Sequence, residues 1–143
     1  MSSGVTTVDY DDIEPLLDAP RLCLIVDDSR TIRRFTARIL EEMKFVVAQA
    51  DTGLSAVECC RAVVPDVILL DWNMPEMDGI TCLKQLRAMP LDPRPTIVMC
   101  TTENGLPKIQ EALEAGADEY IMKPFDKSVL LDKFAQFGLV EQD

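Results

Sequence analysis

Short, fully apolar segments recur along the chain, and each is followed by a stretch whose apolar residues are spaced three or four positions apart. Continuous apolar runs are typical of strands buried on both faces of a parallel sheet, whereas the wider spacing is typical of amphipathic helices. The predicted strands cover residues 22–26, 45–50, 66–71, 96–100 and 119–122. The predicted helices cover about residues 32–43, 54–63, 80–89, 107–115 and 127–137.

This alternation predicts an α/β fold. Because the crossovers between parallel strands are right-handed, the helices cover both faces of the sheet. The expected architecture is a flavodoxin-like, doubly wound five-stranded parallel sheet with five helices. The apolar stripe of the first helix consists of Ile32, Phe35, Ile39, Leu40 and Met43. Gly116 follows the fourth helix, where a left-handed residue is favoured.

Composition narrows the function classes. A length of 143 residues suits one domain with a single core. The net charge of −11 disfavours a nucleic-acid partner, because nucleic-acid-binding surfaces are normally basic. The sequence has no apolar run of membrane-spanning length and no secretory signal pattern, so a cytoplasmic protein without membrane insertion is expected.

The five cysteines do not form a C-x-x-C pair, and the chain has no histidine. A zinc site and nucleophile pairs that need histidine are therefore excluded. Cys23, Cys59, Cys60, Cys82 and Cys100 are interpreted as small, reduced, mostly buried hydrophobes.

Residues 1–20 differ from the rest, because they carry acidic residues and no Lys or Arg. The acidic residues are Asp9, Asp11, Asp12, Glu14 and Asp18. We call this segment the acidic leader and expect it to be flexible. Residues 21–143 form the predicted domain.

Complementary polar residues follow four of the predicted strands. Asp27 and Asp28 follow the first, Asp71 ends the third, Thr101 follows the fourth, and Lys123 follows the fifth. Parallel strands end at one edge of a sheet, so these side chains should share a crevice. Taken singly, each has an ordinary explanation, such as a helix cap at Asp28 or Ser29. Three carboxylates with one ammonium favour a hard divalent cation, and Mg²⁺ fits oxygen ligands best.

Four motifs carry a family resemblance: "LIVDDSRTIRR", "ILLDWNMPEMDG", "VMCTTENG" and "YIMKPF". Together they closely resemble the receiver domain of two-component response regulators, in particular the single-domain, CheY-like chemotaxis type, over about residues 21–137. The resemblance implies that Asp71 is phosphorylated by the phosphohistidine of a sensor histidine kinase or phosphotransfer protein. It also implies that Asp27, Asp28, Asp71 and the backbone carbonyl of Asn73 bind Mg²⁺.

The resemblance assigns further roles. Thr101 and Lys123 would bind the phosphoryl group, and Tyr120 would be an aromatic switch. Asn73, Thr102 and Glu103 would modulate access to the site and the lifetime of the phosphoryl group, which we expect to be short.

The family's readout surface is the face of the fourth helix, fifth strand and fifth helix, which maps to about residues 104–137. It would bind a downstream protein, and a phosphatase is a further candidate partner. The Lys123–Pro124 peptide bond is expected to be cis. Trp72 could contact a partner or pack with its ring partly exposed.

The expected role is that of a signalling phosphoacceptor, most simply in chemotaxis, rather than an enzyme that acts on separate substrates. A phosphorelay, cell-cycle or stress regulator is the alternative within the same family. An aspartyl-nucleophile phosphatase fits less well, because such enzymes place D-x-D at the first strand and carry a cap insertion. A flavin-binding protein would need a loop rich in Ser, Thr and Gly after the first strand, where this chain has "DDSRTIRR". Intact Asp and Lys positions argue against a phosphorylation-independent relative.

Overall fold

The structure, a computed structural model, describes residues 20–102 and 105–141. Within these residues, five strands form one parallel sheet in the order β2-β1-β3-β4-β5. The strands are β1 (Leu22–Val26), β2 (Val46–Ala50), β3 (Val67–Asp71), β4 (Thr96–Thr101) and β5 (Glu119–Met122). The helices are α2 (Arg30–Glu42), α3 (Gly53–Ala62), α4 (Gly79–Ala88), α5 (Leu106–Ala115) and α6 (Lys127–Gln136). The predicted α/β fold is confirmed, with boundaries that differ by only a few residues.

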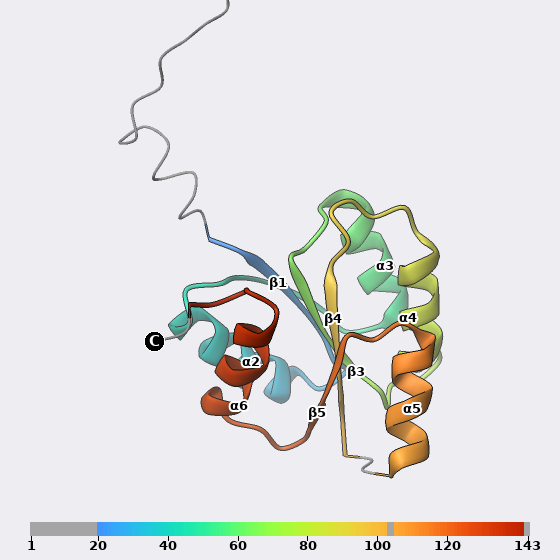
Figure 1. The fold of residues 1–143 in the computed structure, drawn as a ribbon. Helices are drawn as coiled ribbons and strands as arrows, with labels where there is room; N and C mark the ends of the chain where they lie inside the picture. Colours follow the sequence, from blue (N-terminus) through green and yellow to red (C-terminus); the bar gives the residue numbers. More distant parts are fainter. Residues whose placement is uncertain (1–19, 103–104, 142–143) are drawn as a thin grey trace, which may run out of the picture.

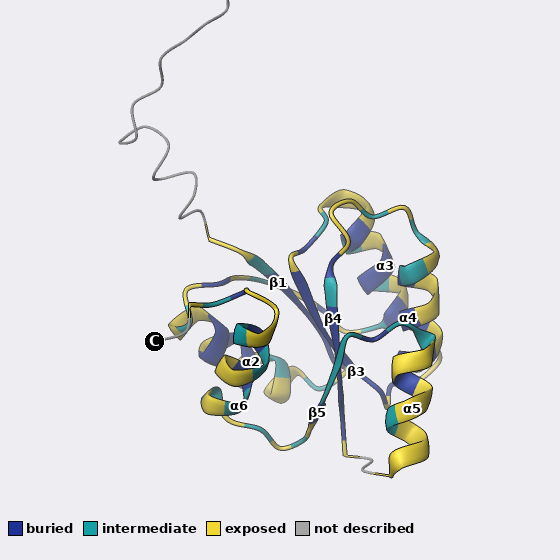
Figure 2. Cartoon of the chain, in the orientation of Figure 1, coloured by how far each residue is buried: buried dark blue, intermediate teal, exposed yellow. Residues whose placement is uncertain are grey.

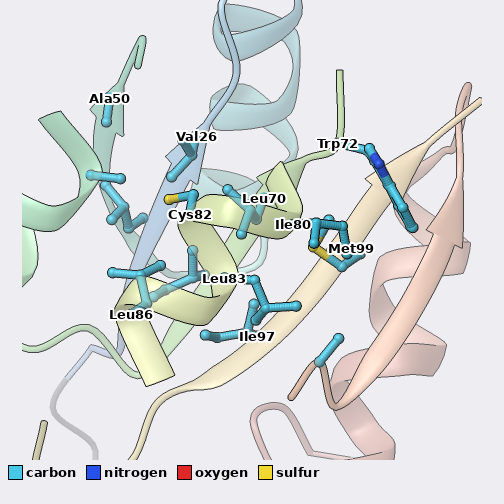
Figure 3. Close-up of a cluster of buried hydrophobic side chains, with 14 of the residues drawn as sticks. Val26, Ala50, Leu70, Trp72, Ile80, Cys82, Leu83, Leu86, Ile97 and Met99 are labelled. Atoms are coloured by element: carbon cyan, nitrogen blue, oxygen red, sulfur yellow. The ribbon is translucent and has the colours of Figure 1, made fainter. Parts of the chain in front are cut away.

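The helices form two layers around the sheet. Figure 1 shows α2 and α6 on one face, and α3, α4 and α5 on the other. Alternate residues of each strand enter alternate cores: Ile25 and Leu69 face α2 and α6, whereas Val26 and Leu70 face α3 and α4. Figure 3 shows the second of these cores, where Leu83 and Leu86 of α4 pack against the sheet. The helices are exposed on their outer sides and buried toward the sheet (Figure 2).

The central strand β3 is buried along its whole length. Its neighbours are β1, in a register that pairs Val26 with Leu70, and β4, where Asp71 pairs with Cys100. The residues that follow Val26 and Leu70 are Asp27 and Asp71. The register therefore places these two carboxylates beside each other at the switch point of the sheet.

Two glycines occupy positions where a side chain would cause backbone strain or a steric clash. Gly116 ends α5 in the left-handed conformation, with φ of 114°, as predicted. At Gly79, the first residue of α4, a Cβ atom would lie 2.3 Å from the backbone oxygen of Asp71. The absence of a side chain at Gly79 lets α4 begin directly against the end of β3, which fixes the backbone at Asp71.

The prediction for the apolar stripe of α2 was partly wrong. Ile39 and Leu40 are buried, but Phe35 is 59% exposed and Ile32 is 38% exposed. The helix instead turns Thr36 and Ala37 toward the sheet. Because these residues are small, α2 can pack closely through them, and this orientation leaves Phe35 at the surface.

The five cysteines, all within the described part of the chain, are free, and four of them are buried. Burial raises the pKa of Cys60 to about 11 and that of Cys82 to about 12. These thiols are therefore protonated at neutral pH and behave as the predicted small hydrophobes. The acidic leader lies outside the described residues except for Pro20. Among the described helices, none is long and apolar enough to cross a membrane.

A network around Arg87 ties α4 to the far end of the sheet. The Arg87 guanidinium donates to the backbone oxygens of Gly116 and Pro95, each at 2.8 Å, and to Asp118 at 2.7 Å. Asp118 also accepts from the backbone N–H of Ile97 at 2.9 Å, at the start of β4. The same carboxylate pairs with Arg94, whose side chain is 59% exposed.

This network predicts different costs for two arginines on one carboxylate. Arg87→Met should lower the free energy of unfolding by about 2–3 kcal/mol, because charged, partly buried hydrogen bonds are lost. Arg94→Met should cost about 1 kcal/mol or less, because exposed ion pairs contribute little. Urea unfolding of both variants measures the difference. Equal losses would show that the Arg87 network is not a structural tie.

Candidate functional site

The Lys123 side chain joins the ends of β1 and β3. Its ammonium lies 2.7 Å from a carboxylate oxygen of Asp27 and 3.0 Å from one of Asp71. Asp27 is 3% exposed and Asp71 is 5% exposed, so both carboxylates are largely removed from water. Charge-assisted hydrogen bonds of this length offset the cost of that burial. The structure thus brings together three residues that the sequence placed on different strands.

Local hydrogen bonds orient this cluster. The other oxygen of Asp27 accepts the backbone N–H of Ser29 at 2.8 Å. The Ser29 hydroxyl in turn caps α2 by accepting the backbone N–H of Ile32. Arg33 donates to the backbone oxygen of Asp27 at 2.6 Å. Of the two candidate caps, Asp28 and Ser29, Ser29 is the N-cap of α2. Asp28 remains exposed beside the cluster.

Asp28 completes a group of three carboxylates. Ligand oxygens of Asp27, Asp28 and Asp71 all lie within 4.8 Å of one another. Lys123 supplies one positive charge, which leaves the four groups with a net charge of −2. A divalent cation would cancel that charge, and a set of carboxylate oxygens beside solvent suits Mg²⁺. The side chains present therefore fit the predicted metal.

The pKa values at the site follow from burial and pairing. Burial raises the pKa of Asp71, and the Lys123 ammonium opposes this rise without cancelling it. Burial alone would lower the pKa of Lys123, but its hydrogen bonds to Asp27 and Asp71 outweigh burial and raise that pKa. Lys123 is therefore a stable cation at neutral pH. Ionised Asp71 still costs folding free energy because it is buried, and a further cation nearby would reduce that cost.

The predicted switch residues lie close to this cluster. Thr101 ends β4 fully buried, and its backbone oxygen accepts the N–H of Lys123 at 2.8 Å. Tyr120 on β5 is partly exposed, and its hydroxyl lies 3.1 Å from the sulfur of Met122. The two residues lie on adjacent strands, because Thr101 pairs with Met122.

The predicted modulators occupy different places. Asn73 is exposed, and its backbone N–H hydrogen-bonds the Asp71 carboxylate, which lowers the pKa of that group. Thr102 is exposed at the end of β4. Glu103 lies outside the described residues. The Lys123–Pro124 peptide bond is cis, as expected.

The expectation for Trp72 was wrong. Its side chain is 5% exposed and belongs to the core beneath α4, where Ile80 and Met99 lie beside it (Figure 3). Its backbone N–H donates to Cys100 on β4 at 3.0 Å, which draws the residue inward. The Lys108 ammonium of α5 lies 5.1 Å from the centre of the indole ring. Trp72 therefore links Asp71 to α5 by packing rather than meeting a partner at the surface.

A surface feature next to the cluster was missed from the sequence. A groove with a volume of about 280 Å³ separates α2 from the loops after β4 and β5. We call it the α2 groove; its lining residues are Ile32, Phe35, Thr36, Thr102, Lys123, Pro124 and Phe125. Phe125 could have indicated the groove from the sequence, because an aromatic residue two positions after Lys123 is expected to contact a neighbouring element.

The raised pKa of Asp71 predicts how stability depends on pH. Because the folded-state pKa lies above its usual value near 3.8, the folded protein holds this proton to higher pH than the unfolded chain. Ionised Asp71 thus destabilises the metal-free fold, and stability falls as pH rises through that window. Asp71→Asn, which mimics the neutral carboxyl group, should be more stable than the native chain at neutral pH in chelator.

Thermal unfolding from pH 3 to pH 8 measures this effect. The difference in melting temperature between Asp71→Asn and the native chain should disappear once the pH falls below the pKa of Asp71 in both the folded and the unfolded state. Added Mg²⁺ should reduce the difference at neutral pH. A native chain that is the more stable of the two at neutral pH in chelator would contradict the prediction.

The carboxylate cluster also predicts the effect of Asp28 on metal binding. Asp28→Asn removes one charged oxygen ligand and should weaken Mg²⁺ binding by about tenfold or more. Asp51→Asn is the control, because Asp51 is an exposed carboxylate that follows β2 and is not one of the three clustered carboxylates. Titration with Mg²⁺, followed by the fluorescence of the single Trp72 beside Asp71, measures both affinities. Equal affinities would place the metal elsewhere.

The chain is similar in sequence and fold to several known proteins. The chemotaxis protein CheY of Bacillus subtilis is 39% identical over 110 residues, which cover 76% of this chain and 90% of that protein. CheY1 of Helicobacter pylori strain J99 is 40% identical over 112 residues, which cover 77% of this chain and 90% of that protein. The structure of Vibrio cholerae CheY4 superposes with a TM-score of 0.78 at 33% identity, and the match covers 82% of this chain and 98% of that one.

The family model described as "Response regulator receiver domain" matches residues 23–135, which span all the strands and helices described above except the last residue of α6 and the first of β1. The match includes each member of the Asp27, Asp71 and Lys123 cluster. The chain belongs to the response regulator receiver family and is of the CheY-like type.

Proposed function

We propose that this protein is a signalling phosphoacceptor, in which Asp71 accepts a phosphoryl group from the phosphohistidine of a sensor histidine kinase or phosphotransfer protein. The observation that carries the proposal is the Lys123 ammonium shared between Asp71 and Asp27, next to a third carboxylate from Asp28. This arrangement supplies a nucleophile, a fixed cation and a set of metal ligands at one point.

The chemistry needs positioning more than covalent help from the protein. A carboxylate oxygen of Asp71 attacks phosphorus and forms an acyl phosphate. The phosphorus–nitrogen bond of the phosphohistidine breaks, and its electron pair returns to the imidazole. Lys123 stabilises charge on the transferred group, since it already lies 3.0 Å from the attacking carboxylate.

Asp27, Asp28, Asp71 and the backbone carbonyl of Asn73 would hold Mg²⁺. When bound, the ion neutralises charge on the oxygens of the phosphoryl group. The net charge of −2 on the four side chains leaves them suited to one divalent cation. Asp27, through Ser29 and Lys123, is the most firmly held of the ligands.

Phosphorylation would then shift an equilibrium that exists in the unmodified protein. The added charge and acceptor oxygens would draw in Lys123 and the hydroxyl of Thr101. Thr101 is buried in this structure, so its movement would leave space that Tyr120 on the adjacent strand could fill. We propose that Thr101 and Tyr120 act together as the switch.

The readout surface proposed for a downstream protein is the face formed by α5, β5 and α6. It exposes large apolar side chains: Leu106 is 65%, Leu113 46% and Met122 39% exposed. Met122 also lies against the Tyr120 hydroxyl, so a change in Tyr120 would alter this face directly.

The names of the similar proteins favour chemotaxis as the pathway. Within that pathway, we propose a component of the flagellar motor as the downstream target. We propose a cytoplasmic signalling role with protein partners, in which the chain promotes only its own phosphorylation and dephosphorylation.

Incubation with Mg²⁺ and phosphoramidate, a small phosphodonor, tests the proposal. The native chain and the control Asp51→Asn should each gain one phosphoryl group by mass, and hydroxylamine should remove it as expected of an acyl phosphate. Asp71→Asn should gain none, because the nucleophile is lost, and Lys123→Met should be slowed at least about tenfold, since electrostatic stabilisation of the transferred group is lost. Equal labelling of Asp71→Asn would refute Asp71 as the acceptor.

A further inference from the structure

The outer side of α2 carries a row of arginines. Arg30, Arg34 and Arg38 are all exposed and are spaced by four residues, which places them on one stripe of the helix. Neither Asp nor Glu occurs between Arg30 and Arg38. The protein as a whole has a net charge of −11, so this stripe is a local reversal of its charge.

These arginines have no acidic partner within the described residues. Ion pairs there involve Arg87, Arg94, Lys108, Lys123, Lys127 and Lys133. Arg33, on the same helix, differs because it hydrogen-bonds Gln49 and the backbone oxygen of Asp27. Arg33 thus supports the fold, whereas Arg30, Arg34 and Arg38 are available to an acidic segment.

An apolar surface runs beside the arginine stripe. Phe35 lies next to the stripe and is 59% exposed, and its ring lines the α2 groove. The groove continues through Ile32 to Pro124 and Phe125. Its occupant should therefore combine acidic residues with apolar ones.

The acidic leader has that composition. It holds five of the acidic residues and no Lys or Arg, and it interleaves them with apolar side chains. These apolar residues are Tyr10, Ile13, Leu16 and Leu17. We propose that residues 9–18 of the leader dock on the outer face of α2, with their carboxylates on Arg30, Arg34 and Arg38 and their apolar side chains along Phe35 and the α2 groove.

The attachment point of the leader permits this path. Pro20 and Arg21 precede β1, and the backbone oxygen of Arg21 accepts the N–H of Val46, four residues after α2 ends. The leader therefore joins the domain near the C-terminal end of α2 (Figure 1). A helix of 13 residues is about 20 Å long. The eleven residues from Tyr10 to Pro20 span up to about 35 Å when extended, which is enough to run back along α2 to the groove.

The docking can be measured without phosphorylation. A nitroxide label at Thr7→Cys, in a full-length Cys59→Ser background, should broaden the amide NMR signals of Arg30–Arg38 and of Lys123–Phe125. The loss of intensity should be reversed by Arg34→Glu with Arg38→Glu. It should also be reversed by salt near 1 M, where the screening length falls to about 3 Å. The matched control is Arg61→Glu, which reverses an exposed arginine on α3 and should change nothing.

A second variant guards against an effect of the arginine substitutions on α2 itself. Neutralising four of the five acidic residues of the leader, with Asp9→Asn, Asp11→Asn, Asp12→Asn and Glu14→Gln, should also remove the broadening. Broadening that is weak or spread evenly over the surface would overturn the proposal. A dilution experiment gives a further contrary outcome. If the broadening in nitroxide-labelled chains is lost when an excess of chains without nitroxide is added, the leader of a second copy occupies the groove, and the proposal is overturned.

Discussion

The fold depends at its functional edge on one ammonium held between two buried carboxylates. Asp27 and Asp71 lie at the ends of neighbouring strands, and without Lys123 their two buried negative charges would face each other with no cation between them. The single positive charge of Lys123 offsets part of the repulsion between Asp27 and Asp71. With Asp28 included, the three carboxylates still carry more negative charge than Lys123 can neutralise. The same charge imbalance that limits stability suits a divalent cation, and under the proposed function it also suits a phosphoryl group that needs one. Stability and the proposed reactivity at this edge would then be two results of a single charge deficit.

The rigidity of the site comes from the strands that carry it. β3 is buried throughout, and α4 starts directly against its end because Gly79 has no side chain. Trp72 packs into the core one residue beyond Asp71, so the backbone at Asp71, the proposed nucleophile, is held on both sides. Fixed groups of this kind lose little freedom when they bind a ligand, which is what positioning of a phosphoryl group requires.

Helix α2 has one face buried against the sheet and another face exposed to solvent. It packs on the sheet through Thr36, Ala37 and Leu40, and this orientation leaves Phe35 exposed beside a row of arginines. An acidic protein that exposes a basic, partly apolar helix next to its carboxylate cluster has an electrostatic preference for acidic segments there. Its own acidic leader is the nearest such segment along the chain.

The sequence by itself determined the alternation of strands and helices, because apolar periodicity is local. It also determined that Asp27, Asp71 and Lys123 would meet, since parallel strands end at one edge of a sheet. Only the tertiary structure decided that Lys123 binds both carboxylates, that Trp72 is buried and that Phe35 is exposed. These outcomes depend on how each helix and loop is rotated against the sheet. Close packing between distant segments sets that rotation, and no local pattern in the sequence records it.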